Sequence, residues 1–316
     1  MSSFEVRAFR RADRDQLTRL VNHHAAAVVP GASVSVNTVL SQLEREPGEF
    51  IVDPWVGERC TLVAEQAGAI VAAALVLRYR DDTDVGESYR NAGEVRWLLF
   101  RPLAPDTNPF WEDGHDAANA LMRACLAQFD AWRVTRHHAD GTLPHPGIYG
   151  VPAQWPHIEH LYQEHSFEHV GSTEIVLIAD LDSIDEPGEP PLPGLGLQRA
   201  VGINGVRLTA DLDSQLAGFI EVDHLDPGQR HPRAGALADI GNLHVVGDHR
   251  RQGVGSWLVQ HAARWLRLGH ADRLLAYASP DETGILGFLA RHHFEEITTT
   301  RRGWIRNPNV PPAPTP

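Results

Sequence analysis

The sequence predicts an α/β protein in which one pattern of strands and helices occurs twice. The chain has 316 residues, enough for two domains of average size, and 42% of them are apolar, enough for two cores. A segment with four prolines and three acidic residues, 183–194, contains little that could pack, and similar elements are expected on both sides of it. We therefore expect domains over 1–182 and 195–306, a linker over 183–194 and a disordered tail over 307–316, where five prolines occur.

The first domain is expected to contain six strands and four helices. Apolar runs predict strands over 4–9, 61–65, 69–79, 94–100, 147–151 and 174–178, and periodicity predicts helices over 13–28, 36–46, 115–132 and 156–165. In the helix over 115–132, Leu121, Cys125 and Phe129 fall on one face, and Asp113 can cap the N-terminus.

The second domain repeats this order without the first two helices. Strands are expected over 195–200, 206–210, 215–223, 240–246, 274–278 and 298–305, and helices over 255–268 and 283–292. Too few residues separate the first two strands to form helices there. The two copies align best after their last helices, where Phe167 and Phe294 are each followed by Glu.

Charge and composition exclude several classes of protein. The net charge is −13, and residues 1–182 carry 26 acidic residues against 15 Arg, which argues against nucleic-acid and membrane-surface partners. All 28 basic residues are Arg, so Schiff-base lysines and a phosphate-loop lysine are excluded. Cys60 and Cys125 support neither a disulfide framework nor a thiolate zinc site. The longest apolar run, 69–77, is far shorter than the ~20 residues of a membrane span, and the N-terminus has no secretory pattern. We expect a cytoplasmic protein.

One segment carries a pattern typical of anion binding. The strand over 240–246 leads into a turn with Arg250, Gly253 and Gly255 at R-x-x-G-x-G spacing, and a helix follows at once. Glycines allow backbone N–H groups to approach a ligand, and a helix N-terminus with Arg250 and Arg251 beside it favours a diphosphate. A turn without a ligand is the simpler alternative. A dinucleotide site is disfavoured, because the next strand ends in Ala278-Ser279-Pro280 without an acidic residue.

In this succession of elements the sequence resembles the GCN5-related N-acetyltransferase (GNAT) superfamily, in a tandem form with a degenerate first copy. The resemblance covers 195–306 well and 4–180 weakly. It implies two mixed, mostly antiparallel sheets flanked by helices, with a V-shaped splay of strands at the site of the co-substrate acetyl-CoA. The coenzyme-binding residues it implies are Leu243, His244 and Val245 for pantetheine, and Arg250, Arg251, Gln252, Gly253, Val254, Gly255 and Ser256 for pyrophosphate. A backbone N–H near Val245 is expected to polarise the thioester carbonyl.

The resemblance also implies direct attack of an amine on the acetyl thioester, with Asp239 as the catalytic base. Glu221 and Asp223 are the reserve candidates. The Tyr that serves the family as general acid is replaced by Leu289, whereas the first copy keeps Tyr162 at that position. The matching turn of the first copy, 111–116, is acidic and would repel a diphosphate.

The sequence thus predicts an N-acetyltransferase whose acceptor is a small-molecule or peptide amine, with one working site in the second domain. The acidic first half favours a cationic acceptor. A catalytically inactive acyl-CoA-binding or regulatory protein and an interaction protein stay open as alternatives. No metal is expected, because adjacent histidines such as His292 and His293 point to different faces. Either of these two could act as an acid or base or simply lie at the surface. Whether the chain forms a homodimer is left open.

Overall fold

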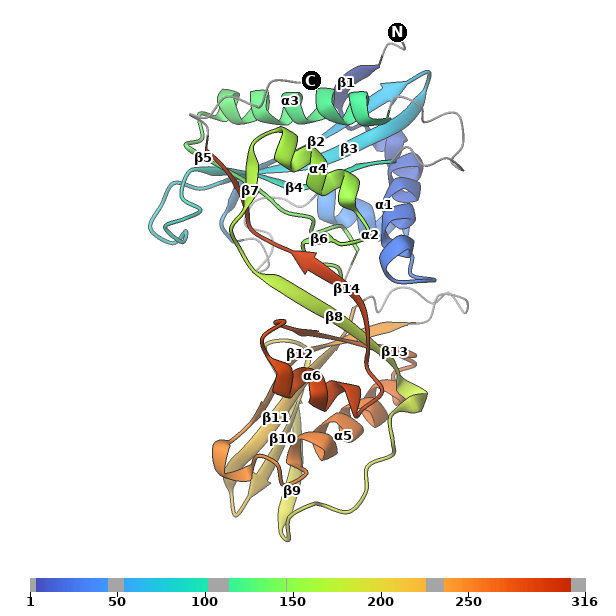
Figure 1. Ribbon diagram of the computed structural model, residues 1–316, viewed down its shortest axis with the longest axis vertical. Coiled ribbons are helices and arrows are strands. Elements are labelled where there is room, and N and C mark those ends of the chain that lie inside the picture. The colour runs from blue at the N-terminus through green and yellow to red at the C-terminus, as the bar shows by residue number, and fades with distance from the viewer. Residues whose placement is uncertain (1–3, 45–53, 102–113, 146, 226–235, 308–316) are drawn as a thin grey trace. The chain divides into compact units, whose positions relative to one another are not determined.

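The computed structural model describes residues 4–44, 54–101, 114–145, 147–225 and 236–307, and it divides into two compact units. Unit 1 contains residues 1–173 and 300–316, and unit 2 contains residues 174–299. Each unit has a mixed, mostly antiparallel sheet flanked by helices, which confirms the predicted α/β class (Figure 1).

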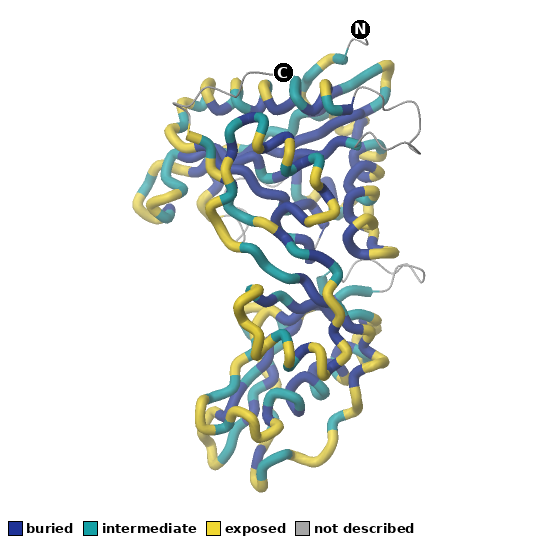
Figure 2. Tube along the Cα trace, viewed as in Figure 1, coloured by how far each residue is buried: buried dark blue, intermediate teal, exposed yellow. Residues whose placement is uncertain are grey.

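Unit 1 is built on a seven-stranded sheet in the order β1-β2-β3-β4-β5-β15-β7. Its strands are β1 (Glu5–Ala8), β2 (Val56–Gln66), β3 (Ala69–Tyr79), β4 (Ala92–Phe100), β5 (Arg136–Ala139), β7 (Phe167–His169) and β15 (Trp304–Arg306). Its helices are α1 (Arg14–Val28), α2 (Val36–Leu43), α3 (Gly114–Trp132) and α4 (Pro156–Glu164). Helix α3 lies along one face of the sheet and α1 lies on the other (Figure 1). Strands β3 and β4 are buried along almost their whole length, so they form the centre of this core (Figure 2).

Unit 2 contains the strand order β14-β8-β13-β12-β11-β10-β9. Its strands are β8 (Thr173–Asp180), β9 (Leu195–Val201), β10 (Val206–Leu212), β11 (Gln215–His224), β12 (Leu237–Val245), β13 (Arg273–Ala278) and β14 (Glu295–Arg301). Helix α5 (Val254–Leu268) packs on β10, β11 and β12, and α6 (Thr283–Ala290) follows β13. The buried face of α5 carries Leu258, Ala262 and Leu266, as its periodicity predicts.

The last strands of the two sequence copies are exchanged between the sheets. Strand β8, expected to close the first domain, pairs antiparallel with β13 in unit 2. Strand β15 pairs with β5 and β7 in unit 1. The single strand predicted over 298–305 is therefore two strands in different sheets. The predicted boundaries at 182 and 195 consequently differ from the division at 173/174 and 299/300. An apolar pattern specifies which face of a strand is buried, but not which of two similar sheets it joins.

The segment 183–194 is not a linker between the units, because the strands on either side of it both belong to unit 2. A 3₁₀ turn, η3 (Leu181–Ser183), opens it, and Ile184 is buried. Arg267 of α5 donates to the carbonyl oxygens of Leu181 and Ile184 and forms an ion pair with Glu186. Trp257 Nε1 donates to the carbonyl oxygen of Gly188. A proline-rich segment lacks N–H donors but keeps its carbonyl acceptors, and α5 uses them.

Most remaining differences from the prediction concern short strands. Strands β5 and β7 have four and three residues and were not predicted, and the strand expected over 147–151 reduces to β6 (Val151–Pro152). Strands this short carry too few side chains for a readable alternation. The predicted tail lies outside the described residues except for Asn307. Within the described part of the chain, no helix is long and apolar enough to cross a membrane.

Candidate active site

The candidate site begins where two parallel strands of unit 2 separate. Strands β12 and β13 pair over only three residues, from Leu237↔Arg273 to Asp239↔Leu275. Beyond Asp239 the two strands leave a pocket of about 220 Å³ between them. The side chains and backbone around it belong to β12, β13 and α6, and they include Ile240, Gly241, Asn242, Leu243, Tyr277, Glu282 and Leu289.

A β-bulge in β12 accompanies this separation. Glu221 of β11 is opposite Asn242 and Val222 is opposite Ile240, so that Gly241 is an extra residue in β12. A side chain at Gly241 would meet the Cβ of Asn204 at 2.5 Å, because the β9–β10 turn lies directly against the bulge. Glycine is therefore required here by close approach, a feature that the sequence pattern did not reveal.

Beyond the bulge, alternate backbone groups of β12 face away from β11. The N–H of Val246 donates to Ala217 of β11, so by alternation the backbone of His244 also faces β11 and those of Leu243 and Val245 face away from it. The Nε–H of Arg250 donates a hydrogen bond to the Val245 carbonyl oxygen at 2.9 Å. Of the three residues predicted to pair with pantetheine, Leu243 and Val245 thus direct backbone groups toward the gap, while His244 pairs within the sheet.

The turn after β12 has the conformation that an anion-binding loop requires. Arg251 (φ 59°) and Gly253 (φ 89°) both adopt the left-handed region, and α5 begins immediately afterwards without a side-chain cap. The first-turn N–H groups of Val254, Gly255 and Ser256 have no acceptor within the helix. Arg250, Arg251 and the loop around them are exposed. Donors and positive charge therefore converge where the sequence predicts the pyrophosphate.

The two glycines of this turn differ in what they tolerate. A Cβ at Gly253 would lie 2.9 Å from the Cβ of Pro191 in addition to the strained φ. A Cβ at Gly255 would make only ordinary contacts, the nearest being 3.4 Å from Phe288. Gly255 is therefore not required for packing.

Asp239 is the last residue of β12 that pairs with β13, two positions before the bulge. Its neighbours Ala238 and Ile240 belong to the core beneath α5, so the Asp239 side chain lies on the opposite face of the sheet. Only 8% of Asp239 is exposed. Burial, with a smaller contribution from the charge of Asp223 across the ladder, raises the pKa of Asp239 to about 6. No cation among the described residues pairs with Asp239.

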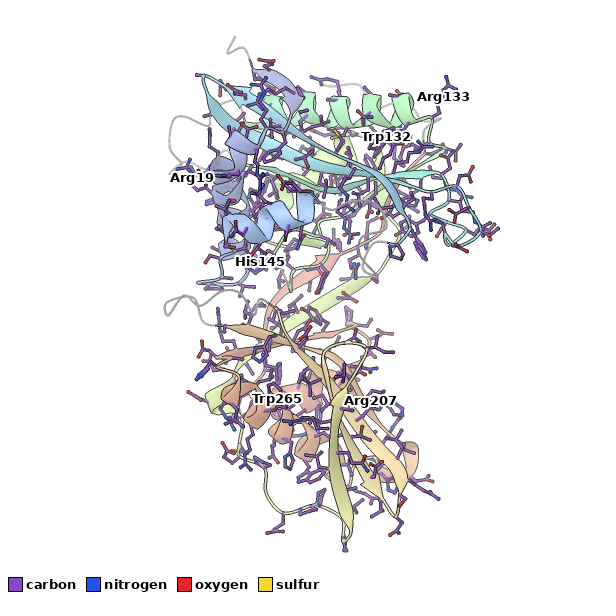
Figure 3. The ribbon with its side chains drawn as sticks, turned by 180° about the vertical axis from the view of Figure 1, so that it is seen from behind. Arg19, Trp132, Arg133, His145, Arg207 and Trp265 are labelled. Atoms are coloured by element: carbon purple, nitrogen blue, oxygen red, sulfur yellow. The ribbon has the colours of Figure 1, made fainter. Side chains whose placement is uncertain are left out.

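The two reserve carboxylates differ from Asp239. Glu221 is 2% exposed and is held by Arg207, 3.5 Å away, and by the Asn204 amide at 3.3 Å. The guanidinium of Arg207 also stacks over the Phe219 ring, and Figure 3 marks its position in unit 2. Asp223 is exposed. Glu221 is thus held by structural contacts and the charge of Asp223 raises the pKa of Asp239, whereas Asp239 itself is buried without a cationic partner among the described residues.

The position of the missing general acid faces the pocket. Leu289 on α6 is buried and lines the gap between β12 and β13, so a Tyr there would reach the same space. Tyr277 of β13 and Glu282 also line the pocket, and sequence reasoning did not single them out. Tyr277 follows Leu275 at an interval of two, which places both on one face of the strand, and this alternation could have indicated it.

Unit 1 repeats the bulged strand, but its carboxylate is hydrogen-bonded within the core. In β4, Arg96 is the extra residue, because Leu75 is opposite Trp97 and Val76 is opposite Val95. Glu94 therefore stands two positions before the bulge, as Asp239 does in unit 2. Its carboxylate accepts a hydrogen bond from the Tyr79 hydroxyl inside the core.

The acid candidate of unit 1 is also part of a core. The Tyr162 hydroxyl donates to the Asp140 carbonyl oxygen at 2.6 Å, and burial raises its pKa well above the ordinary value. Tyr162 is therefore a packed structural residue. The acidic turn over 111–116 lies outside the described residues up to position 113, and Gly114 begins α3. No group of histidine, cysteine and carboxylate side chains suited to a metal occurs in the described ranges.

Comparisons with known proteins agree with this geometry. The acetyltransferase (GNAT) family model matches residues 179–294. No curated protein matches the sequence. Among solved structures, the chain is similar to a tandem GNAT protein from the clavulanic acid biosynthesis pathway, with a TM-score of 0.65, 15% identity and coverage of 99% of this chain and 100% of that one. It is also similar to a GCN5-related N-acetyltransferase from Sphaerobacter thermophilus, with a TM-score of 0.59, 15% identity and coverage of 96% and 95%.

A third similar structure is larger. A GCN5-related glucosamine N-acetyltransferase region of a fungal multi-domain β-N-acetylglucosaminidase gives a TM-score of 0.63 at 14% identity, covering 96% of this chain. The chain spans only 38% of that protein's length. At these identities the similar structures establish the fold of both units, and the family match concerns unit 2.

Proposed function

Because residues 179–294 form a domain of the acetyltransferase (GNAT) family, we propose that the protein is an acetyl-CoA-dependent N-acetyltransferase with a single site in unit 2. One observation carries the proposal. Unit 2 combines three features: the separated strands β12 and β13, the bulge at Gly241, and the start of α5 without a side-chain cap. The gap and the bulge would accommodate the thioester, and the start of α5 would bind the diphosphate.

The residues present fit the coenzyme. Val254, Gly255 and Ser256 would donate backbone N–H groups to the pyrophosphate, with Arg251 and Gln252 beside them. Leu243 and Val245 would pair with the pantetheine arm, and the N–H of Val245 would donate to the thioester carbonyl oxygen, where negative charge develops. The bound coenzyme supplies the activated acetyl group.

Asp239 would act as the base. Its carboxylate accepts a proton from the attacking amine, directly or through a water molecule, as the nitrogen bonds to the carbonyl carbon and the carbon–sulfur bond breaks. A pKa of about 6 leaves most of the carboxyl ionised at pH 7 while keeping it more basic than a solvated Asp. Leu289 cannot protonate the leaving thiolate, so solvent supplies that proton.

The acceptor is proposed to be a cationic amine, either a small molecule or a peptide. Glu221, Asp223 and Asp239 lie on the face of the sheet opposite α5, and alternation places their side chains on that face together. Asp223 and Asp239 there attract a protonated amine. The amine loses one proton to solvent before attack, and Asp239 accepts the second as the nitrogen bonds to the carbonyl carbon.

A second candidate function is coenzyme binding without turnover. The observation that favours it is Leu289, which fills the position of the family's acid with a side chain that has no proton to transfer. The two functions share the coenzyme site and differ only in whether product forms.

Calorimetric titration with acetyl-CoA tests the proposal. We expect one binding site per chain and a loss of affinity of about tenfold or more in Gly255→Ala, because its Cβ blocks the approach of the diphosphate. Gly255→Ala makes only ordinary packing contacts, so an unchanged melting temperature shows that folding is intact. Gly287→Ala, in α6 with nothing within 4 Å of the added Cβ, is the matched helical glycine control for stability.

Formation of free thiol in the presence of a panel of amines then separates the two functions. Thiol release that depends on the amine supports transfer. Binding without release of thiol for any amine supports the second candidate. Absence of saturable binding would contradict both.

A further inference from the structure

A histidine from the end of α6 contacts the first turn of α5. His292 lies two residues after α6, is 8% exposed, and places its Nε2 2.9 Å from the Oγ of Ser256. Ser256 is the third residue of α5 and belongs to the proposed pyrophosphate loop. The neighbouring His293 is exposed. One of the two adjacent histidines is thus directed at the loop and the other is not.

The proton on His292 decides what Ser256 can offer a ligand. A hydroxyl has one proton to donate and can accept hydrogen bonds at the same time. If Nε2 of His292 carries a proton, it donates to Oγ and leaves the Ser256 hydroxyl proton for an anion at the start of α5. If Nε2 is unprotonated, it accepts the hydroxyl proton, and Ser256 then presents only its backbone N–H to the anion.

The charges around His292 oppose its protonation while no anion is bound. Burial and the adjacent charges of Arg291 and His293 lower its pKa, and Asp185 is the group that raises it. The helix N-terminus that Ser256 belongs to adds further partial positive charge. A diphosphate at this helix N-terminus would bring negative charge close to the imidazole and reverse this balance.

We propose that His292 is a positioning residue for the coenzyme diphosphate, which donates through Nε2 to Ser256 and takes up a proton when the diphosphate binds. This inference rests on the proposed function, because it assigns the diphosphate to the start of α5. The hydrogen bond and the burial of the imidazole carry it. The consequence is that coenzyme affinity increases as pH falls through the range in which His292 titrates.

The test is calorimetric titration of the full chain with 3′-dephospho-coenzyme A between pH 6 and 8, in buffers of different ionisation enthalpy. This probe keeps the pyrophosphate but lacks the phosphate monoester, which would itself titrate with a pKa of about 6. The buffer dependence of the binding heat gives the number of protons taken up. We expect the wild-type protein to take up a fraction of a proton that increases toward pH 6.

Three variants isolate the role of His292. His292→Gln keeps an N–H donor in place of Nε2 but cannot titrate, so we expect near wild-type affinity at pH 8 and the loss of proton uptake. His292→Phe loses the donor and should bind about tenfold more weakly. His293→Gln is the matched control and should behave like the wild-type protein.

The outcomes separate this inference from the proposed function. Proton uptake by His292→Gln equal to that of the wild-type protein would overturn the role of His292 while coenzyme binding stands. Wild-type protein that binds neither this probe nor acetyl-CoA would overturn the proposed function itself. Ser256→Ala supplies a second check, because it should reduce proton uptake as His292→Gln does.

Discussion

The two units contain the same bulged strand and use it in opposite ways. In unit 1, Glu94 stands two residues before the bulge at Arg96, and its carboxylate accepts a hydrogen bond from the Tyr79 hydroxyl. In unit 2, Asp239 stands two residues before the bulge at Gly241, and no cation among the described residues pairs with it. The sheet geometry is therefore common to both units, and the neighbouring residues decide whether the buried carboxylate supports packing or chemistry.

The largest expected effect is on catalytic activity, where substitution of Asp239 and of Glu94 should have different consequences. Asp239→Asn removes the proposed base and should reduce kcat by about 10²–10⁴-fold with the amine that the panel identifies. The rate of the wild-type protein should rise with pH through about 6, where the Asp239 carboxyl ionises. Glu94→Gln, the matched substitution in unit 1, should leave kcat unchanged. A comparable loss of activity in both variants would show that unit 1 takes part in catalysis.

The next effect tests the exchange of strands between the two sequence copies. Trp304→Ala in β15 should destabilise unit 1 by about 3–5 kcal/mol, although Trp304 lies near the C-terminus. Leu177→Ala in β8 should destabilise unit 2 by about 2–4 kcal/mol. Hydrogen exchange resolved by peptide reports on the two units separately. If Leu177→Ala accelerated hydrogen exchange in β1–β4 rather than in β10–β13, this would contradict the assignment of β8 to the sheet of unit 2.

A smaller effect concerns how the stability of unit 1 depends on pH. Burial lowers the pKa of His24 in unit 1 to about 4, against an ordinary value of 6.5. The unfolded chain therefore binds a proton that the folded unit does not, so stability is lost as pH falls from about 6.5 to 4, on the order of 3 kcal/mol for this residue. His24→Asn should flatten the dependence of the free energy of unfolding on pH in this range. His137, His157 and His165 have lowered pKa values too, so part of the dependence should persist, but an equally steep dependence would exclude a contribution from His24.

The smallest effect concerns unit 2, where the stability depends on pH with the opposite sign. The pKa of Asp239 is raised in the fold, so its contribution to stability is present below pH 3.8 and is lost as pH rises through about 6. Asp239→Asn should therefore stabilise unit 2 at pH 7, by roughly 1–3 kcal/mol, while activity falls. Chemical denaturation at pH 7 measures this difference. A destabilised variant would mean that the ionised Asp239 has favourable contacts that its surroundings do not suggest.

Local signals in the sequence predicted the parts of the site that depend on one segment. The sequence predicts the turn with Gly253 and Gly255 because the backbone conformation and the helix that follows determine its residue types and their spacing. Asp239 was identified through the family resemblance, and its environment came only from the structure. The bulge at Gly241 depends on Asn204, some forty positions earlier, and such a contact leaves no mark in a local pattern.

The exchange of β8 and β15 was missed for a related reason. Each strand has an apolar pattern that suits either sheet, so the pairing partner is decided by tertiary contacts that periodicity does not record. The segment 183–194 was read as a linker because its prolines and acids do not form a core. Its carbonyl oxygens, which accept hydrogen bonds from Arg267 and Trp257, carry no compositional signature.

A crystal structure of the protein with acetyl-CoA tests the central claim most directly. The account predicts one molecule per chain, with its diphosphate at the N–H groups of Val254 to Ser256 and its thioester between β12 and β13, beside Leu243 and Val245. Coenzyme bound at β4 of unit 1, or at unit 2 away from the start of α5, would contradict the assignment of a single acetyltransferase site to unit 2.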